Sequence, residues 1–270
     1  MKNKTFTAII VSAAMTMALS AAEVRVALIG SSACQAYNTN HPELIWGWGE
    51  VIGKFFKPEV KILNFAISGY SSKSFIDRGK WKKTIDSKPH YVFITIGAND
   101  SKKTRDRYTD PETTYRANIN KFIRETRAIG ATPVIVTINQ SMWRNKETNK
   151  AYFRDGKAFR KDREPYSKVL RDIAKKENLV CIDLAKIQQQ KMEAMGEAAA
   201  GSLYRVRDLE KRILDTSHTN LKGALFIARI IVDELEKSSS PLKKELLPAD
   251  KRSEIEKQLL ASPAPAAAKK

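Results

Sequence analysis

The sequence predicts an α/β fold, a three-layer α/β/α domain on a doubly wound, five-stranded parallel sheet. Two observations predict it. Short apolar runs alternate along the chain with amphipathic stretches, and the runs are apolar almost without interruption. Such runs are typical of strands buried on both faces, as in a parallel sheet covered by helices. The 270 residues also suffice for one large domain with a full core.

Five apolar runs are the expected strands, at 24–29, 60–65, 91–96, 133–138 and 179–184. Amphipathic stretches predict helices at 46–56, 165–176 and 221–236. The clearest helix signal starts at Asp110, an N-cap residue followed by Pro111 at the first helical position. Apolar residues then recur at helical spacing until Gly130, which indicates the C-terminal stop.

The N-terminal residues 1–22 are typical of a secretory signal peptide. Lys2 and Lys4 precede a short apolar stretch, and small residues follow it. The stretch is too short and too rich in Ala, Ser and Thr to favour a membrane span, although an uncleaved anchor is the alternative. We expect cleavage near Ala21 or Ala22, which gives a secreted or periplasmic protein without a stable membrane span.

The predicted folded domain covers residues 23–237. Residues 238–270 are rich in Ser, Pro, Ala and Lys and end in "ASPAPAAAKK". This composition predicts a low-complexity or disordered C-terminal tail, with one short helix around 252–260. Cys34 and Cys181 permit one disulfide in an exported protein without requiring it, and Cys181 is expected to be buried in its apolar run.

The chain is strongly basic, with 48 Lys and Arg against 30 Asp and Glu and a net charge of +18. Residues 144–168 hold nine basic residues against four acidic ones, with aromatic residues among them. A solvated basic surface is one explanation, and a polyanionic partner is the other. No nucleic-acid-binding signature accompanies the charge, so an acidic glycan is favoured over DNA or RNA.

Four polar segments stand where functional residues are expected in an open α/β sheet, at the carboxyl ends of strands. They are "GSS" with Ser31 and Ser32 after the first strand, "AISGYSSKS" with Gly69 after the second, "GAND" with Asn99 after the third, and "LDTSHTN" before the last helix. Each segment alone is a weak signal. Their order and their positions together make a strong one.

With these four segments the chain resembles the SGNH (GDSL-type) hydrolases over roughly residues 23–237. The resemblance implies a flavodoxin-like strand order, with Ser32 as the nucleophile, Gly69 and Asn99 in the second and third blocks, and Asp215 with His218 in the last. Within that family the chain looks most like the rhamnogalacturonan acetylesterase branch. The stretches behind this are "NFAISGYSSKSFIDRGKW", "IGAND", "EPYSKVLRDIAKKENLVCIDL" and "DTSHTNLKGALFIARIIVDEL".

The chemistry of these residues fits acyl transfer. A serine hydroxyl needs an adjacent base, and of the three histidines only His218 has a carboxylate three residues upstream. Asp215 would hold one ring nitrogen while the other faces Ser32. The alternative is that Asp215 and His218 only cap the last helix.

The negative oxygen of a tetrahedral intermediate needs donors already aimed at it. Candidates are the backbone N–H groups of Ser32 and Gly69 and the side-chain amide of Asn99. An ordinary strand-to-loop turn is the alternative for Asn99 and its neighbour Asp100. We expect Asp100 to support loop backbone and not to serve as the triad acid.

Two positions depart from the family pattern. Ser31 stands where an aspartate braces the nucleophile turn, and Ala98 stands where the acetylesterase branch often has histidine. A serine can still bond to nearby backbone, but as a weaker brace. The departures leave the substrate open, and a non-catalytic, glycan-binding member of the fold remains an alternative.

The insert at 139–163 is the candidate substrate surface, with Trp143 and Arg144 where the chain leaves the fourth strand. Tyr70 and the segment of Trp46 and Trp48 are further candidates, although the two tryptophans could equally serve helix packing. Aromatic faces stack on sugar rings, and basic side chains pair with uronate carboxylates.

The sequence contains no GxSxG, no HExxH, no Cys/His cluster and no paired-carboxylate arrangement, so an α/β-hydrolase lipase, a metal site and a glycosidase are not favoured. We therefore expect an exported serine esterase without cofactor or metal. It would remove acetyl or other short acyl groups from an acidic poly- or oligosaccharide such as pectin. Besides the non-catalytic scaffold, a lysophospholipase or thioesterase of the same fold is the alternative.

Overall fold

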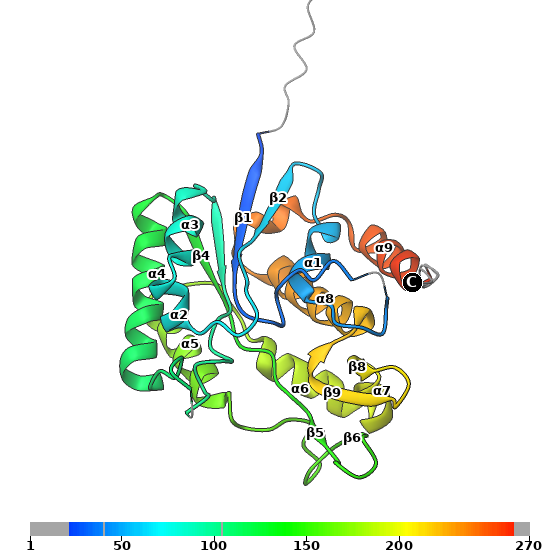
Figure 1. Ribbon diagram of the computed structural model, residues 1–270. Helices are drawn as coiled ribbons and strands as arrows, with labels where there is room; N and C mark the ends of the chain where they lie inside the picture. Colours follow the sequence, from blue (N-terminus) through cyan, green and yellow to red (C-terminus); the bar gives the residue numbers. More distant parts are fainter. Residues whose placement is uncertain (1–21, 40, 104, 262–270) are drawn as a thin grey trace, which may run out of the picture.

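The computed structural model describes residues 22–39, 41–103 and 105–261. Its central sheet has five parallel strands in the order β2-β1-β3-β4-β7 (Figure 1). They are β1 (Val24–Ile29), β2 (Val60–Asn64), β3 (Tyr91–Ile94), β4 (Thr132–Val136) and β7 (Cys181–Ile182). All five predicted strands and the doubly wound topology are confirmed. The predicted signal peptide lies outside the described residues except for Ala22.

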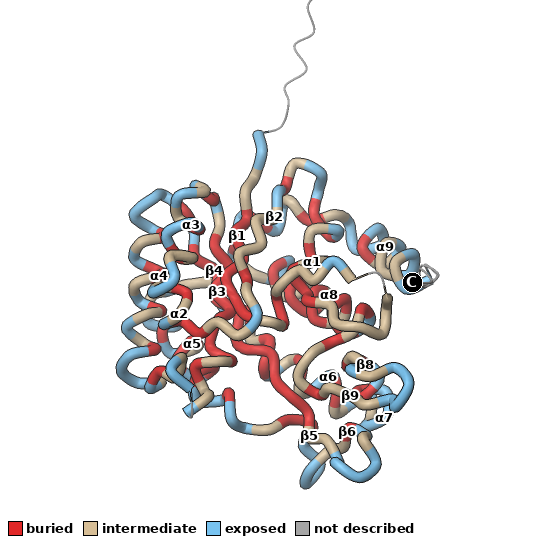
Figure 2. Tube along the Cα trace, viewed as in Figure 1, coloured by how far each residue is buried: buried red, intermediate tan, exposed pale blue. Residues whose placement is uncertain are grey.

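Helices cover both faces of the sheet, as the three-layer prediction requires (Figure 1). Within β1, Val26 and Leu28 belong to the core on one face, and Ala27 and Ile29 to the core on the other. The inner strands β1, β3 and β4 are buried along most of their length (Figure 2). The first face carries α1 (Trp48–Val51), η1 (Ile52–Phe55) and α8 (Leu221–Lys237); the second carries α2 (Ser72–Asp77), α3 (Lys80–Asp86), η2 (Pro111–Tyr115), α4 (Arg116–Ala128) and α5 (Glu164–Lys176).

The start of the η2–α4 segment shows why the sequence signal was readable. The Asp110 carboxylate accepts hydrogen bonds of 3.0 Å from the backbone N–H groups of Glu112 and Thr113. It thereby satisfies donors that have no partner within the helix. At the other end Gly130 takes a φ of +74°, which favours glycine.

Two β-hairpins lie beyond the carboxyl ends of the sheet strands (Figure 1). They are β5 (Trp143–Arg144) with β6 (Ala151–Tyr152), and β8 (Tyr204–Asp208) with β9 (Ile213–Thr219). Together with α6 (Leu184–Met195) and α7 (Glu197–Gly201) they enclose a small core of their own, which includes Met142, Phe159, Met192 and Tyr204. Neither hairpin was predicted, and Asp215 and His218 lie in β9, not in a loop.

The C-terminal segment is folded as far as Ala261, which differs from the expected low-complexity or disordered tail, although the short helix expected around 252–260 is present. It forms η3 (Pro241–Glu245) and α9 (Ala249–Ala261), and Leu242 is fully buried. Arg252 in α9 is 1% exposed and donates to Glu236 at the end of α8 over 2.6 Å. Leu246 is buried as well, and Ile255 and Leu259 of α9 pack against the same core; these apolar residues are too widely spaced among polar ones for the apolar pattern to have revealed the packing. Among the described helices none has the length and apolar character needed to cross a membrane.

Both cysteines are free thiols. Cys34 is buried behind the serine turn, and burial raises its pKa. Cys181 is exposed on β7, so the expectation of a buried residue is wrong. The reason is that β7 is the last strand of the sheet order and therefore an edge.

Close backbone packing at Gly49 generates a stability prediction. A Cβ at this position would lie 2.3 Å from the Cys34 carbonyl oxygen and 2.8 Å from its sulfur. Gly49→Ala is therefore expected to lower the free energy of unfolding by about 1–3 kcal/mol, measured by urea unfolding. Gly201→Ala is the control, because its Cβ would meet only Ala151 Cβ at 3.3 Å. Equal stabilities of the two variants would contradict this packing.

Candidate active site

The serine turn begins directly after β1. A Cβ on Gly30 would lie 3.0 Å from Thr95 Cγ2 and 3.1 Å from Cys34 Cβ, so only glycine fits without displacement. The Ser31 carbonyl closes the turn by accepting from the N–H groups of Cys34 (2.9 Å) and Gln35 (3.1 Å). Ser31 itself is only 4% exposed, whereas Ser32 is half-buried. Of the two serines, Ser32 is the one that solvent reaches.

The histidine and the aspartate meet because β9 is irregular. Tyr204 pairs with Thr219 while its neighbour Arg205 pairs with Asp215, so residues 216–218 have no partner in β8. Side chains three apart in a regular strand point to opposite faces. The bulge removes this restriction, and His218 Nδ1 lies 2.8 Å from Asp215 Oδ2.

Asp215 is held by further donors. The Ser217 N–H donates to its Oδ1 over 3.0 Å, and Arg205 Nε donates to its Oδ2 over 2.9 Å. Burial alone would raise the pKa of Asp215, but His218, the Ser217 N–H and Arg205 outweigh it and hold that pKa well below its usual range. The group beside His218 is therefore a carboxylate throughout the neutral range.

The three expected oxyanion donors follow β1, β2 and β3. Gly69 has a φ of +82°, and its carbonyl accepts from Arg107 Nη1 over 2.9 Å. Asn99 Nδ2 donates to the Tyr70 carbonyl over 2.9 Å, which leaves its second N–H available. Within residues 22–39, 41–103 and 105–261, the backbone N–H groups of Ser32 and Gly69 donate to no acceptor.

Asp100 ties the loop after β3 to the start of α2. It is fully buried and accepts from the Ser72 N–H (3.0 Å), the Ser72 hydroxyl (2.5 Å) and the Thr109 hydroxyl (2.6 Å). Burial raises its pKa despite these hydrogen bonds, which act in the opposite direction. The expectation that Asp100 supports loop backbone is confirmed, and it does not contact His218.

The serine turn and the bulge of β9 are joined through the segment before α1. Trp48 N donates to the Ala33 carbonyl, and Trp46 N donates to the Thr219 carbonyl, each over 2.9 Å. Trp48 is 1% exposed and is therefore a core residue, whereas Trp46 is half-buried. In the described chain no hydrogen bond joins Ser32 to His218. In enzymes without substrate this contact is often long and tightens on binding.

Tyr37 is a site residue that the sequence did not reveal. Its hydroxyl donates to the Ser32 carbonyl over 2.9 Å. Burial raises its pKa, while the charge of Arg205 lowers it and that of Asp215 raises it. Tyr37 therefore braces the serine turn through the Ser32 carbonyl, and Glu50 holds Tyr37 in turn by accepting from its backbone N–H over 2.9 Å. Its spacing from Ser32 follows no motif, so pattern analysis could not have found it.

Trp143 and Arg144 line a pocket of about 360 Å³ that reaches Asp215. Its other charged residues are Lys146, Arg160 and Arg207, so Asp215 is the only acid in a basic lining. Arg160 also borders a neighbouring hollow of about 600 Å³ between the insert and α6. The predicted residues Trp143 and Arg144 are thus brought next to Asp215.

Tyr70 does not share that pocket. It lines a separate hollow of about 230 Å³ beside Gly69, with Lys73, Arg78 and Arg107 among the other lining residues. Arg78 lies over its ring at 5.2 Å, and the ring edge packs on Phe75. Tyr70 is therefore partly a packing residue on the opposite side of the predicted oxyanion donors.

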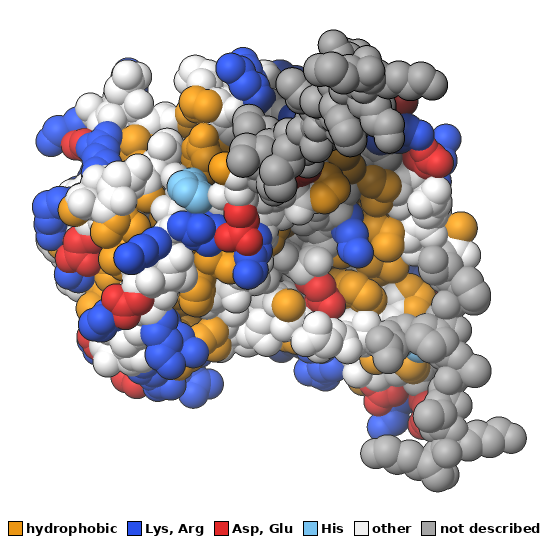
Figure 3. All heavy atoms as spheres, turned by 90° about the horizontal axis from the view of Figure 1, so that it is seen from above, with side chains coloured by type: hydrophobic (Ala, Val, Ile, Leu, Met, Phe, Trp, Pro, Cys, Tyr) orange, Lys and Arg blue, Asp and Glu red, His pale blue; other side chains and the backbone are white. Residues whose placement is uncertain are grey.

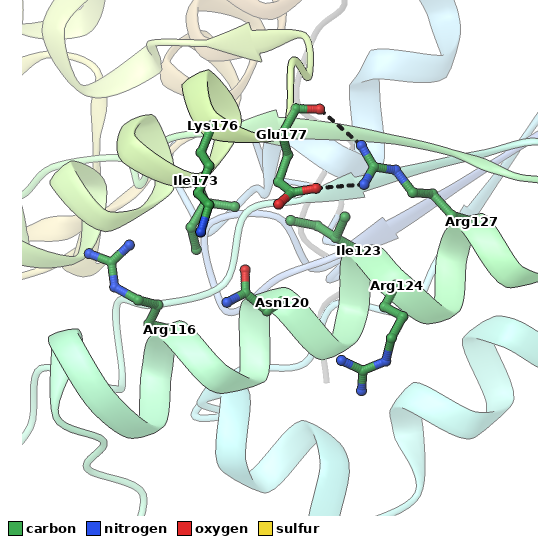
Figure 4. A pocket seen from close by; sticks show the side chains of 8 residues that line it. All are labelled: Arg116, Asn120, Ile123, Arg124, Arg127, Ile173, Lys176 and Glu177. Atoms are coloured by element: carbon green, nitrogen blue, oxygen red, sulfur yellow. Dashed lines mark hydrogen bonds and ion pairs between the residues drawn. The ribbon is translucent and has the colours of Figure 1, made fainter.

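Basic side chains also gather away from the carboxyl ends of the sheet strands. A groove between α4 and α5 is lined by Arg116, Arg124, Arg127 and Lys176, and Arg127 pairs with Glu177 over 2.7 Å (Figure 4). At the end of the molecule where the strands begin, lysine and arginine alternate with acidic side chains (Figure 3). Positive charge alone does not distinguish the site. The α4–α5 groove and the Trp143–Arg144 pocket each have four basic residues and one acid in their lining, and what distinguishes the pocket is that its acid is Asp215, the partner of His218.

The other two histidines have structural surroundings. His90 Nδ1 accepts from the Arg25 N–H over 2.9 Å at the start of the sheet, and His41 Nδ1 accepts from the Glu43 N–H over 3.2 Å. The hydroxyl of Ser31 makes no hydrogen bond to any described residue. The weaker brace expected at this position is therefore not formed through that hydroxyl.

Comparison with known proteins defines the class. The family described as GDSL-like Lipase/Acylhydrolase matches residues 26–231. The chain belongs to this family, and it is an ester hydrolase by class.

Particular relatives are acetylesterases. The chain is 26% identical over 223 residues to YesY of Bacillus subtilis, named "Probable rhamnogalacturonan acetylesterase", covering 82% of this chain and 96% of that one. It is 27% identical over 215 residues to rhamnogalacturonan acetylesterase RhgT of the same organism, covering 77% and 88%. The fold also resembles acetylxylan esterase Axe2 of Geobacillus stearothermophilus, with a TM-score of 0.56 and 19% identity over 79% of this chain and 94% of that one.

The depressed pKa of Asp215 predicts a pH-dependent contribution to stability. The carboxylate stabilises the fold fully above the unfolded pKa of about 4, and this contribution is lost as the pH falls toward the lower folded value. Asp215→Asn should therefore lose about 1–3 kcal/mol of unfolding free energy at pH 7 and progressively less below pH 4. Urea unfolding at both pH values measures it.

Asp208→Asn in the same hairpin is the control, because Asp208 accepts only the Lys211 N–H at the exposed turn. A difference between wild type and Asp215→Asn that is constant from pH 7 to pH 3 would contradict the assignment.

Proposed function

We propose that the protein is an exported serine esterase that removes acetyl or other short acyl groups from an acidic poly- or oligosaccharide. Ser32 is the nucleophile, His218 the base and Asp215 the acid that orients it. The observation that carries the proposal is the 2.8 Å contact between His218 Nδ1 and an ionised Asp215. It lies on a strand that is joined through Trp46 and Trp48 to the turn of Ser32.

In the proposed reaction Ser32 Oγ attacks the ester carbonyl while His218 Nε2 takes the hydroxyl proton. Asp215 stabilises the imidazolium through Nδ1. The negative oxygen is bound by the N–H groups of Ser32 and Gly69 and by the second N–H of Asn99. His218 then protonates the leaving sugar oxygen, and water hydrolyses the acyl-serine by the same route in reverse.

An acidic carbohydrate is supported by the pocket beside Asp215 and by the relatives. Arg144, Lys146, Arg160 and Arg207 line that pocket, and its only acid is already paired. Guanidinium groups bind carboxylates through paired hydrogen bonds, and the indole of Trp143 offers a face for a sugar ring. YesY and RhgT carry names that refer to rhamnogalacturonan.

The nucleophile assignment is tested by covalent labelling. A fluorophosphonate should label Ser32 in the wild type, and peptide mapping should locate the adduct. Ser32→Ala and His218→Ala should each lower acetate release from acetylated pectin about 10⁴–10⁶-fold, and Asn99→Ala about 10²–10³-fold. Ser31→Ala is the matched control, and this variant should still be labelled at Ser32. A folded wild type without label or acetate release would instead indicate a non-catalytic scaffold.

The substrate assignment is tested by charge removal in the pocket. Arg144→Met should raise KM for an acetylated, uronate-containing oligosaccharide about 10-fold, the value of one charge-assisted hydrogen bond. The same variant should leave kcat/KM for a neutral acetate ester unchanged. Lys150→Met is the control, since Lys150 is an exposed lysine of the same hairpin outside the pocket. Equal KM values for wild type and Arg144→Met would overturn the acidic substrate, and a preference for long acyl chains would favour a lipid substrate.

A further inference from the structure

Arg205 makes an unusual contact with the acid of the proposed triad. It lies directly opposite Asp215 in the β8–β9 register. Its Nε and Nη2 each lie 2.9 Å from Asp215 Oδ2. The same oxygen lies 2.8 Å from His218 Nδ1. One carboxylate oxygen thus accepts from the base and from a cation together, while Oδ1 accepts from the Ser217 N–H.

The contact is sheltered from solvent. The side chains of Arg205, Asp215 and His218 are 23%, 16% and 26% exposed. Exposed ion pairs contribute little because water and salt screen them, whereas this pair is screened much less. Its effect on the neighbouring imidazole is therefore electrostatically significant.

We propose that Arg205 is a positioning residue for the base: it fixes the Asp215 carboxylate and weakens the attraction of that carboxylate for a protonated His218. This inference rests on the proposed function. The guanidinium places a full positive charge beside Asp215 Oδ2. Without Arg205, the negative charge of this oxygen would be directed to the His218 imidazolium only. The enzyme consequently stays active at a lower pH than the same triad would without Arg205.

The other charged and titratable groups around this cluster are few and mostly basic. On β8 they are Tyr204 and Arg207; on the insert Arg144, Lys146, Arg160, Asp162 and Arg163; after β1 Tyr37; and on the loop before α1 His41 and Glu43. Glu43 is paired with Arg212 over 2.8 Å. Arg205 is the cation in direct hydrogen-bond contact with Asp215, so its replacement is the cleanest change of local charge.

Two variants separate charge from geometry. Arg205→Gln retains a hydrogen-bond donor without the charge, and Arg205→Lys retains the charge without the two-pronged donor. The measurement is kcat and KM from pH 4 to pH 9 on a neutral acetate ester, with the acetate quantified after quenching. Arg212→Met is the control, because it removes a cation from the same hairpin without touching Asp215.

Arg205→Gln should shift the acidic limb of the kcat/KM profile upward by about 0.5–1 pH unit, because a positive charge that disfavours protonated His218 has been removed. Arg205→Lys should keep the limb within 0.2 pH units of wild type, a margin well below that ~0.5–1 unit shift, yet lose about 10-fold in kcat through looser orientation. KM should stay within about 2-fold in both variants, since uniform binding is untouched. Arg212→Met should match the wild type.

The inference is overturned if Arg205→Gln and Arg205→Lys both keep the wild-type pH profile and lose only thermal stability, because Arg205 would then merely fix the hairpin. If Arg205→Gln does not fold, Arg205→Lys alone decides. An acidic limb in Arg205→Lys that moves by about half a pH unit would then also overturn the inference, because the charge is retained in that variant. Failure of the proposed function has a different signature: the wild type itself would give neither a fluorophosphonate adduct at Ser32 nor acetate.

Discussion

The polar edge of this molecule depends on three residues of β9 that have no partner in β8. Without this irregularity Asp215 and His218 would project from opposite faces of a strand. Because residues 216–218 bulge out of the ladder, the imidazole turns back onto the carboxylate. β-Bulges are found next to active sites for this purpose, since they redirect a side chain without breaking the surrounding pairing. The small core formed by Met142, Phe159, Met192 and Tyr204 holds the hairpin that carries the bulge.

A second constraint fixes the serine turn against this hairpin. The segment from Trp46 to Gly49 lies between them and bonds to both backbones. Gly47 and Gly49 permit this, because a Cβ on either would lie within 2.3 Å of a backbone oxygen of residues 34–35. The loops after β1, β2 and β3 are linked in turn by the contacts of Ile67 N with the Gly30 carbonyl and of Asn99 with the Tyr70 carbonyl. The site is therefore assembled from backbone contacts that few side chains can alter.

The strands and the helix starts could be predicted from the sequence because their causes act within a few neighbouring residues. Apolar runs predicted the five strands, and Asp110 with Pro111 predicted a helix start, because burial and capping act within a few residues. The candidate site residues were found from strand ends and from a family resemblance. Arg205 and Tyr37 were not, because their roles arise from the register of a bulged hairpin and from a loop crossing. The packing of residues 241–261 onto the domain was missed for a similar reason, although the helix around 252–260 was expected, since the packing depends on widely spaced buried residues such as Leu242 and Arg252.

The serine at position 31, where the family pattern has aspartate, changes how the serine turn is held and not whether it is held. Tyr37 donates to the Ser32 carbonyl, and Glu50 accepts from the backbone N–H groups of Tyr37 and Asn38 over 2.9 and 3.1 Å. On the other side Asn64 Nδ2 donates to the Cys34 carbonyl over 2.8 Å. These contacts hold the turn from the chain that follows it, whereas an aspartate at position 31 would hold it from within. Tyr37 thus ties the backbone of Ser32 to Glu50 at the end of the turn that faces the loop before α1.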